Sequence, residues 1–175
     1  TAEAGDIYDG VQFTRTVALL SEDLVVFLDR VEADRERTFD IAYHQLGRWD
    51  DLPDADPWAA ADTDGYLHMR DGHARRVDGV TLRGEIADGV ATAVTLASNE
   101  ATTVVTGTGV GDHLEDRVPM VIFRRSAKHA DFAWAVSLTG EAADIAWDGE
   151  LLTVSDNAGG RWRLRIQADG TLTRD

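Results

Sequence analysis

One histidine, His44, lies where a side chain could exchange a proton with a bound ligand. In the segment 38–46, the alternate residues Phe39, Ile41 and Tyr43 are apolar, and this pattern predicts a strand that turns them towards the core. His44 then lies on the opposite face, at the end of that strand. An imidazole in this place could donate to a sugar hydroxyl or act in proton transfer. The alternative is a structural histidine that is hydrogen-bonded within the fold.

Aromatic side chains follow His44 in a segment of different composition. Residues 48–72 are rich in Asp, Pro and Ala, and they contain Trp49, Trp58 and Tyr66. A loop of this length in a compact domain is often functional or disordered. Tyr and Trp combine an apolar ring with a polar tip, which suits stacking on sugars. We therefore predict a carbohydrate-binding site from these three aromatic residues and His44. The other tryptophans lie in predicted strands and are expected in the core: Trp134, Trp147 and Trp162.

The residues that could hold a metal do not follow a recognisable spacing. The acidic run 50–56 could supply oxygen ligands to calcium, but it lacks the glycine and the final glutamate of an EF-hand loop. A solvated loop is the preferred interpretation. His68 and His73 flank a turn, and their spacing does not support a zinc site. The glycine-rich run 107–111 is not a phosphate loop, because no Lys-Ser/Thr pair follows it. No cofactor and no metal is predicted.

An arginine within an apolar strand needs an acidic partner inside the fold. Arg15 lies in such a strand, and Asp29 and Asp40 are its candidate partners. A guanidinium can bind a carboxylate through two parallel hydrogen bonds. An internal ion pair is therefore favoured over contact with a ligand.

Composition limits the classes of partner. The chain has 175 residues, of which 43% are hydrophobic, so a packed globular fold is expected. Its formal net charge of −15 repels nucleic-acid phosphates and anionic lipid, and neither is an expected partner. The absence of cysteine excludes disulfides and thiolate chemistry. The chain begins at Thr1 without an apolar leader, so we expect a processed chain or a fragment.

Alternating apolar residues and frequent turn signals predict an all-β fold. We expect one domain over residues 1–175, an antiparallel two-sheet β-sandwich of about eleven or twelve short strands with a long loop at about 48–72. The predicted strands are residues 11–20, 24–31, 38–46, 73–82, 90–96, 102–107, 119–126, 131–137, 143–147, 151–155, 161–167 and 171–173.

The order of these segments resembles the C-terminal β-sandwich of heparinase II/III-like polysaccharide lyases, a family that includes alginate and oligoalginate lyases. The resemblance covers about three quarters of the chain, and its motifs are packing motifs rather than a catalytic signature. The matching segments are YDGV at 8–11, RTV at 15–17, LVVFLDRV at 24–31, TFDIAYH at 38–44, PMVIFRR at 119–125 and ADFAWAV at 130–136.

The resemblance implies a role in cleaving acidic polysaccharide by β-elimination. In that family the catalytic Tyr and His residues lie mainly on an N-terminal α/α-toroid, which this sequence lacks. The family's catalytic residues therefore cannot be placed here, and His44 is the one position considered near the cleft. Where the family has a basic residue before the arginine of the first strand, this chain has Phe13-Thr14. The implied partners are an acidic polysaccharide and the toroid, in an extracellular or periplasmic location.

Two other functions remain open from the sequence. An independent carbohydrate-binding module would expose Trp49, Trp58 or Tyr66 beside a groove. A structural or interaction domain without a ligand would bury its tryptophans and bring no polar groups together. The directions in which Trp49, Trp58 and His44 point distinguish these possibilities.

Overall fold

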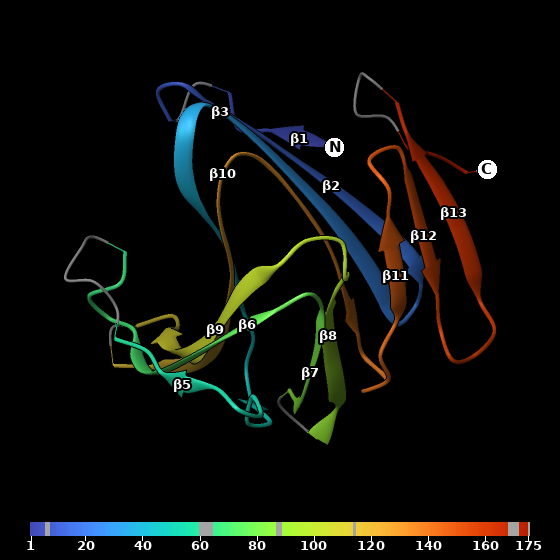
Figure 1. Ribbon diagram of the computed structural model, residues 1–175. Coiled ribbons are helices and arrows are strands. Elements are labelled where there is room, and N and C mark those ends of the chain that lie inside the picture. The colour runs from blue at the N-terminus through green and yellow to red at the C-terminus, as the bar shows by residue number, and fades with distance from the viewer. Residues whose placement is uncertain (6–7, 60–64, 87–88, 114, 168–171, 175) are drawn as a thin grey trace.

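Strands dominate the computed structural model of the chain. It describes residues 1–5, 8–59, 65–86, 89–113, 115–167 and 172–174, and no α-helix occurs among them. Within this part of the chain, no helix is long and apolar enough to cross a membrane. The strands form one ten-stranded and one four-stranded antiparallel sheet, which confirms the predicted all-β sandwich (Figure 1).

The first sheet contains the strands up to residue 137, and the second contains the last four. The first-sheet strands are β1 (Ala2–Glu3), β2 (Val11–Ser21), β3 (Leu24–His44), β4 (Arg48–Trp49), β5 (Asp56–Pro57), β6 (Arg70–Val77), β7 (Val80–Glu85), β8 (Ala91–Leu96), β9 (Thr102–Val110) and β10 (Arg117–Ser137). The second-sheet strands are β11 (Asp144–Trp147), β12 (Leu151–Ser155), β13 (Arg161–Ile166) and β14 (Leu172–Arg174).

A long two-stranded ribbon forms the axis of the first sheet. β3 and β10 each have 21 residues and pair from Met120 opposite His44 to Ser137 opposite Leu24. Their register shifts once, between Ala127 and His129. Such an irregularity bends the strands and changes which residues face the core.

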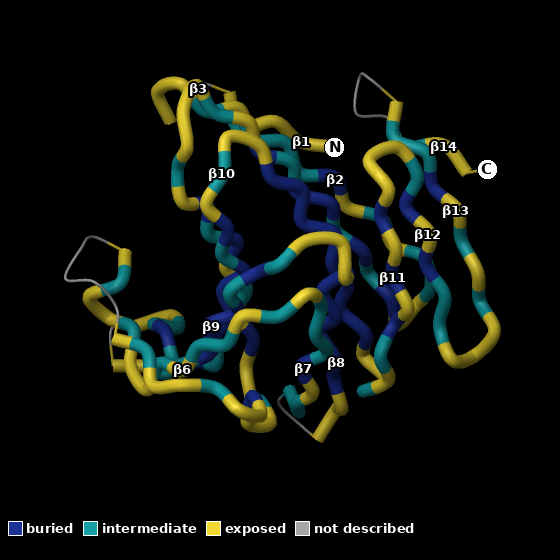
Figure 2. Tube along the Cα trace, in the orientation of Figure 1, coloured by how far each residue is buried: buried dark blue, intermediate teal, exposed yellow. Residues whose placement is uncertain are grey.

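The other edge of β10 divides the sheet into two arms. The first half of β10 pairs with β9, which in turn pairs with β6, whereas the last residues of β10 pair with β8, which pairs with β7. The main core includes residues from both arms, among them Phe123, Val104, Trp134 and Val94. A second core lies between the two sheets and contains Leu28, Ala133, Trp147 and Val154. Figure 2 shows that the buried segments lie within the strands and that most turns are exposed.

A buried carboxylate joins three strands of the first sheet. Asp29, which is fully buried, accepts two hydrogen bonds from Arg15, at 2.5 Å from Nε and 2.9 Å from Nη2. It also accepts one from Trp134 Nε1 at 2.8 Å. The Trp134 ring stacks on Phe27 with centroids 4.0 Å apart. Of the two predicted partners of Arg15, the structure therefore selects Asp29, because the two residues lie opposite one another on β2 and β3.

The remaining tryptophans behave as predicted. Trp134 and Trp147 are buried, and Trp162 is half-buried and packs against the core between the sheets. The predicted segments 24–31 and 38–46 are one continuous strand, as are 119–126 and 131–137, because the ribbon bends without breaking. The reverse holds at 73–82, which a bend at Asp78-Gly79 divides into β6 and β7.

Two further boundaries differ from the prediction. The expected loop 48–72 contains the short strands β4 and β5, which lie at sheet edges. β9 extends to Val110 instead of ending at Gly107, because the glycines sit in the ladder where neighbouring groups approach the backbone closely. The expected strand 171–173 is β14 from Leu172 on, and residue 171 lies outside the described residues.

We predict that Asp29→Ala lowers the free energy of unfolding by about 3 kcal/mol, because a buried ion pair loses one partner. Asp29→Asn keeps an oxygen for Trp134 and loses the charge, so it should cost less. Urea unfolding measures both changes. Asp112→Ala, at an exposed position, is the control and should stay within about 0.5 kcal/mol of the wild type. Equal stability of Asp29→Ala and this control would contradict the assigned role.

Candidate functional site

One face of the arm formed by the end of β3, the beginning of β10, β9 and β6 is turned away from the main core. We call it the outer face. Residues directly opposite on neighbouring strands point to the same side. One row across the four strands therefore contains Asp40, Arg124, Thr103 and Arg76. A second row, across three of them, contains His44, Met120 and Gly107.

Described residues on either side of 60–64, after β5, cover part of the outer face. The aromatic residues Trp58 and Tyr66 pack with Met69 against a small core that includes Met120 and Ile122. The two rings meet edge to face, with centroids 6.0 Å apart and an interplanar angle of 77°. Backbone pairing anchors Trp58, whose N donates to Gly72 O at 2.8 Å. Both rings are half-buried, so each retains some exposed surface.

Arg124 links this aromatic pair to the sheet. Its Nε and Nη2 donate to the two carboxylate oxygens of Asp40, each at 2.7 Å, and Nη2 also donates to the Tyr66 hydroxyl at 2.9 Å. The guanidinium carbon lies 5.3 Å from the Trp58 ring centroid and 5.4 Å from that of Tyr66, within cation–π range. The hydrogen bond to Asp40 raises the pKa of Arg124, so its positive charge persists at all ordinary pH values.

His44, the histidine of the predicted site, is exposed. No described residue forms a hydrogen bond with its ring, and the role of the imidazole stays a prediction. The ring lies over Gly109, where an added Cβ would come within 2.8 Å of His44 Nε2 and 2.9 Å of Met120 Sδ. Partial burial lowers the pKa of His44 below its ordinary value of 6.5. The imidazole is therefore neutral at neutral pH and can accept or donate a hydrogen bond.

The two polar centres of the outer face are separate. His44 lies four residues beyond Asp40 on β3, which corresponds to about 13 Å along a strand. The imidazole therefore cannot contact the Asp40–Arg124 pair directly. A long ligand that lies across this face could reach both, whereas a single small group could not.

Trp49 lies elsewhere. It pairs with Gly84 at the other end of the sheet, packs against the main core and meets Tyr43 at 6.2 Å between centroids. Tyr43 faces the side opposite to His44. Trp49 borders a groove of about 530 Å³ that His73 and Arg117 also line. The structure thus brings His44, Trp58 and Tyr66 to one face and leaves Trp49 on the other, where its binding role stays a prediction.

Sequence reasoning did not identify two arginines of the outer face. Arg124 follows the apolar run 119–123, and its pairing with Asp40 depends on the register of two distant strands. Arg76 is exposed, and no described residue forms an ion pair with it. Arg76 could have been noticed as one of two consecutive arginines. Nothing in the sequence indicates that it lies in the same row as Arg124.

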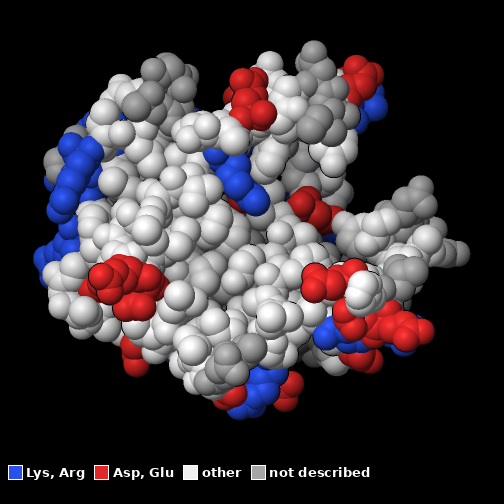
Figure 3. Space-filling model, turned by 180° about the vertical axis from the view of Figure 1, so that it is seen from behind, with Lys and Arg blue, Asp and Glu red and all other residues white. Residues whose placement is uncertain are grey.

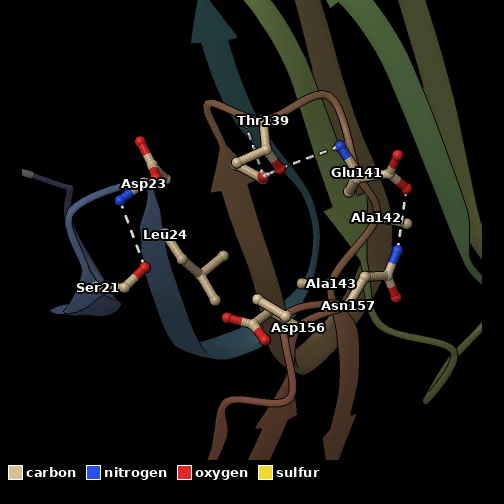
Figure 4. A pocket seen from close by; sticks show the side chains of 11 residues that line it. Ser21, Asp23, Leu24, Thr139, Glu141, Ala142, Ala143, Asp156 and Asn157 are labelled. Atoms are coloured by element: carbon tan, nitrogen blue, oxygen red, sulfur yellow. Dashed lines mark hydrogen bonds between the residues drawn. The ribbon is translucent and has the colours of Figure 1, made fainter.

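A separate hollow lies where the ends of the two sheets meet (Figure 4). It has a volume of about 610 Å³, and Asp23, Glu141 and Asp156 are among its lining residues. Asn157 Nδ2 donates to Glu141 Oε2 at 2.9 Å, and Asp156 Oδ1 accepts from the backbone of Gly160. Asp156 thus serves its own turn, whereas Glu141 links the loop before β11 to the turn after β12. Among the residues that the structure describes, no group of three or more His, Asp or Glu side chains could hold a metal ion.

Ionisable side chains are unevenly distributed over the back of the molecule. Figure 3 shows that most Lys, Arg, Asp and Glu side chains on this face lie near its margin, around a broad area of other residues. Among the described residues, large apolar side chains that are exposed include Val17, Leu19, Leu46 and Leu67. Apolar surface therefore remains accessible on the chain as described.

The fold is similar to part of a known polysaccharide lyase. The crystal structure of a heparan sulfate lyase HepC mutant from Pedobacter heparinus matches 96% of this chain with a TM-score of 0.57 and 12% sequence identity. The match covers 24% of that protein, so this chain spans about a quarter of its length. At this identity the likeness is one of fold. No protein-family model matches the sequence, and no curated protein matches it.

We predict that Gly109→Ala displaces the imidazole of His44, because the new methyl group would occupy the space of Nε2. A displaced ring is better solvated, so its pKa should rise towards 6.5. An NMR titration of the ring measures this pKa. Thr108→Ala is the control. It changes the neighbouring residue, whose side chain lies on the other side of β9, and should leave the pKa of His44 unaltered. An unchanged pKa in Gly109→Ala would show that this contact does not hold the ring.

The lowered pKa of His44 also predicts a pH dependence of stability. Between the folded pKa and 6.5 the unfolded chain binds more protons, so the free energy of unfolding rises with pH across this window. The contribution is complete above 6.5 and is lost as the pH falls through the folded pKa. Urea unfolding at a series of pH values measures this dependence. In this window the free energy of unfolding should rise less steeply with pH for His44→Gln than for the wild type. Identical slopes would contradict the prediction.

Proposed function

We propose that this chain is the β-sandwich portion of a polysaccharide lyase that cleaves uronate-containing polysaccharide by β-elimination. The observation that carries this proposal is the match of 96% of the chain to a part of a heparan sulfate lyase. In such a lyase, a base removes the proton next to the uronate carboxylate and an acid protonates the leaving oxygen. These catalytic groups would belong to a helical α/α-toroid outside this chain, and the sandwich would support the toroid and shape its cleft.

The outer face supplies the chemistry that such a cleft requires of this chain. Trp58 and Tyr66 offer partly exposed rings to sugar faces, and His44 offers a neutral imidazole to a hydroxyl. Arg76 offers a guanidinium that no described residue pairs with, which suits a carboxylate or sulfate group. These groups would bind and orient glycan. None of them is proposed as the base of the elimination.

Charge limits how the glycan can bind. The net charge of −15 repels a polyanion at long range, so attraction must come from local arginines. Arg124 is neutralised by Asp40, and Arg76 therefore provides the principal positive charge of its row. Binding that depends on one or two exposed charges should weaken as salt increases.

An extracellular or periplasmic location, where such polysaccharides occur, completes the proposal.

A second candidate is an independent carbohydrate-binding module. The Trp58–Tyr66 pair around Arg124 favours it, because this cluster is complete within the chain and needs no further domain. The two candidates share the same face and differ in whether the chain acts alone.

The first test is the intact mass of the natural protein together with its activity on alginate and heparan sulfate, followed through the absorbance of the unsaturated product. A natural protein that is larger than this chain and forms the product supports the lyase proposal. A protein of this chain alone that binds these glycans without cleaving them supports the binding module. If the natural protein forms no unsaturated product and binds none of these glycans, both candidates are overturned.

We predict that Arg76→Ala lowers the affinity of the natural protein for heparan sulfate oligosaccharides by about fivefold to tenfold, equivalent to about 1 kcal/mol. Isothermal titration calorimetry at low salt measures this affinity. Arg83→Ala removes another exposed arginine, from β7, and should have little effect. Equal losses in the two variants would indicate a nonspecific charge effect instead of a site on the outer face.

A further inference from the structure

A groove between the two arms of the first sheet carries polar groups that the outer face does not use. β4 is the last strand of the arm that continues through β8 and β7, whereas β9 and β6 form the other arm. Residues of both arms line this groove of about 530 Å³. Trp49 of β4 lines it from one arm, and Thr106 and Thr108 of β9 line it from the other. The groove is therefore separate from the Trp58–Tyr66 pair.

A buried hydrogen-bond donor of this groove has no partner among the described residues. This donor is Trp49 Nε1. The side-chain oxygen and nitrogen of Gln45, a residue that is 8% exposed, also lack described partners. Gln45 lies beside the groove, because its backbone N donates at 3.2 Å to the carbonyl of Pro119, which is a lining residue. Buried polar atoms normally have hydrogen-bond partners, so these atoms indicate a place for a polar ligand.

The charges of the groove disfavour an anionic ligand. Three exposed carboxylates line it without an ion-pair partner among the described residues: Asp50, Asp51 and Asp71. Two arginines also line it, and the charge of Arg48 is offset by Glu85 at 3.2 Å. Arg117 alone therefore opposes three negative charges. A uronate or sulfate group would be repelled here, whereas an uncharged ligand would not.

Hydrogen-bond donors and acceptors both line the groove. Arg117 donates to the His68 carbonyl, which holds the guanidinium in place. His73 Nδ1 lies 3.2 Å from the Asp71 carbonyl and donates to it, because a carbonyl can only accept. Nε2 of the neutral ring is then left as an acceptor. Hydroxyl groups suit this mixture, since each can donate and accept, whereas an ammonium group offers no acceptor to the indole N–H of Trp49.

We propose that this groove binds an uncharged sugar residue. The indole N–H of Trp49 donates to an oxygen of the sugar, and the carboxylates of Asp50 and Asp71 accept from its hydroxyl groups. Tryptophan suits this role because it joins an apolar ring to a polar N–H. The ligand class differs from the uronate or sulfate proposed for the outer face, and the residues are different. The inference therefore does not depend on the proposed function.

The test is an NMR titration of the Trp49 indole N–H signal in the natural protein at low salt. The probes are the methyl glycosides of glucose, galactose and mannose, each compared with the methyl glycoside of the corresponding uronic acid. At least one uncharged glycoside should shift the Trp49 signal in a saturable manner. Its uronic acid counterpart, which differs by one carboxylate, should bind at least about tenfold more weakly because of the lining aspartates.

Matched variants test the role of the indole N–H. Trp49→Phe keeps an aromatic ring and removes the N–H, so it should weaken binding of the uncharged glycoside by about fivefold. The backbone amide signals of Thr106 and Thr108 report binding in this variant. Trp162→Phe, which changes a half-buried tryptophan of the second sheet, is the control and should leave the affinity unaltered.

A second variant tests the charge without changing the wall of the groove. The double change Asp50→Asn and Asp51→Asn, at exposed positions, should reduce the preference for the uncharged glycoside over the uronic acid. The proposal would be overturned by a Trp49 signal that no uncharged glycoside shifts, or by a uronic acid that binds as tightly as its counterpart. Shifts confined to the Trp58 indole N–H would also overturn it, because the sugar would then lie on the outer face.

Discussion

The pairing of β3 with β10 is the constraint on which the other elements depend. Two 21-residue strands run side by side through nearly all of the first sheet. Every other strand of that sheet joins one of them directly or through one or two intervening strands. The single register shift between Ala127 and His129 divides the ribbon. Before it, Val121 and Phe123 of β10 face the main core, and after it Phe132 and Trp134 do. One irregularity thus lets both halves of the ribbon line the same core.

Buried carboxylates fix the half of the ribbon after the register shift against its neighbours. Asp29 binds Arg15 and the indole of Trp134 and so joins β2, β3 and β10. Asp131 accepts a hydrogen bond from Trp147 Nε1 at 2.9 Å, which ties the first sheet to the second. A chain with a large excess of acidic residues therefore uses two of them as acceptors within its cores. Their removal would leave indole or guanidinium groups without partners in a region of low polarity.

The outer face depends on the same ribbon. Its rows of polar residues exist because β10 places Arg124 opposite Asp40 and Met120 opposite His44. The segment with Trp58 and Tyr66 folds onto this face because Arg124 can hold the Tyr66 hydroxyl and both rings at once. Glycines in β9 leave room for this segment and for the imidazole. The site is therefore a consequence of sheet register combined with small residues at the points of closest approach.

The sequence by itself determined the all-β content, the apolar side of the strand segment that ends at His44 and the tryptophans of the core. It also placed His44 opposite to Phe39 and Ile41, because side chains alternate strictly along a strand. Alternation within a strand says nothing of which distant strand will pair with it. For that reason only the tertiary structure decided that Arg15 pairs with Asp29 and Arg124 with Asp40. It also decided that Trp49 lies on the opposite face from Trp58 and that Arg76 shares a row with Arg124. Strand order, register and the one irregularity in β10 are properties of the whole sheet, and they set which of these side chains meet.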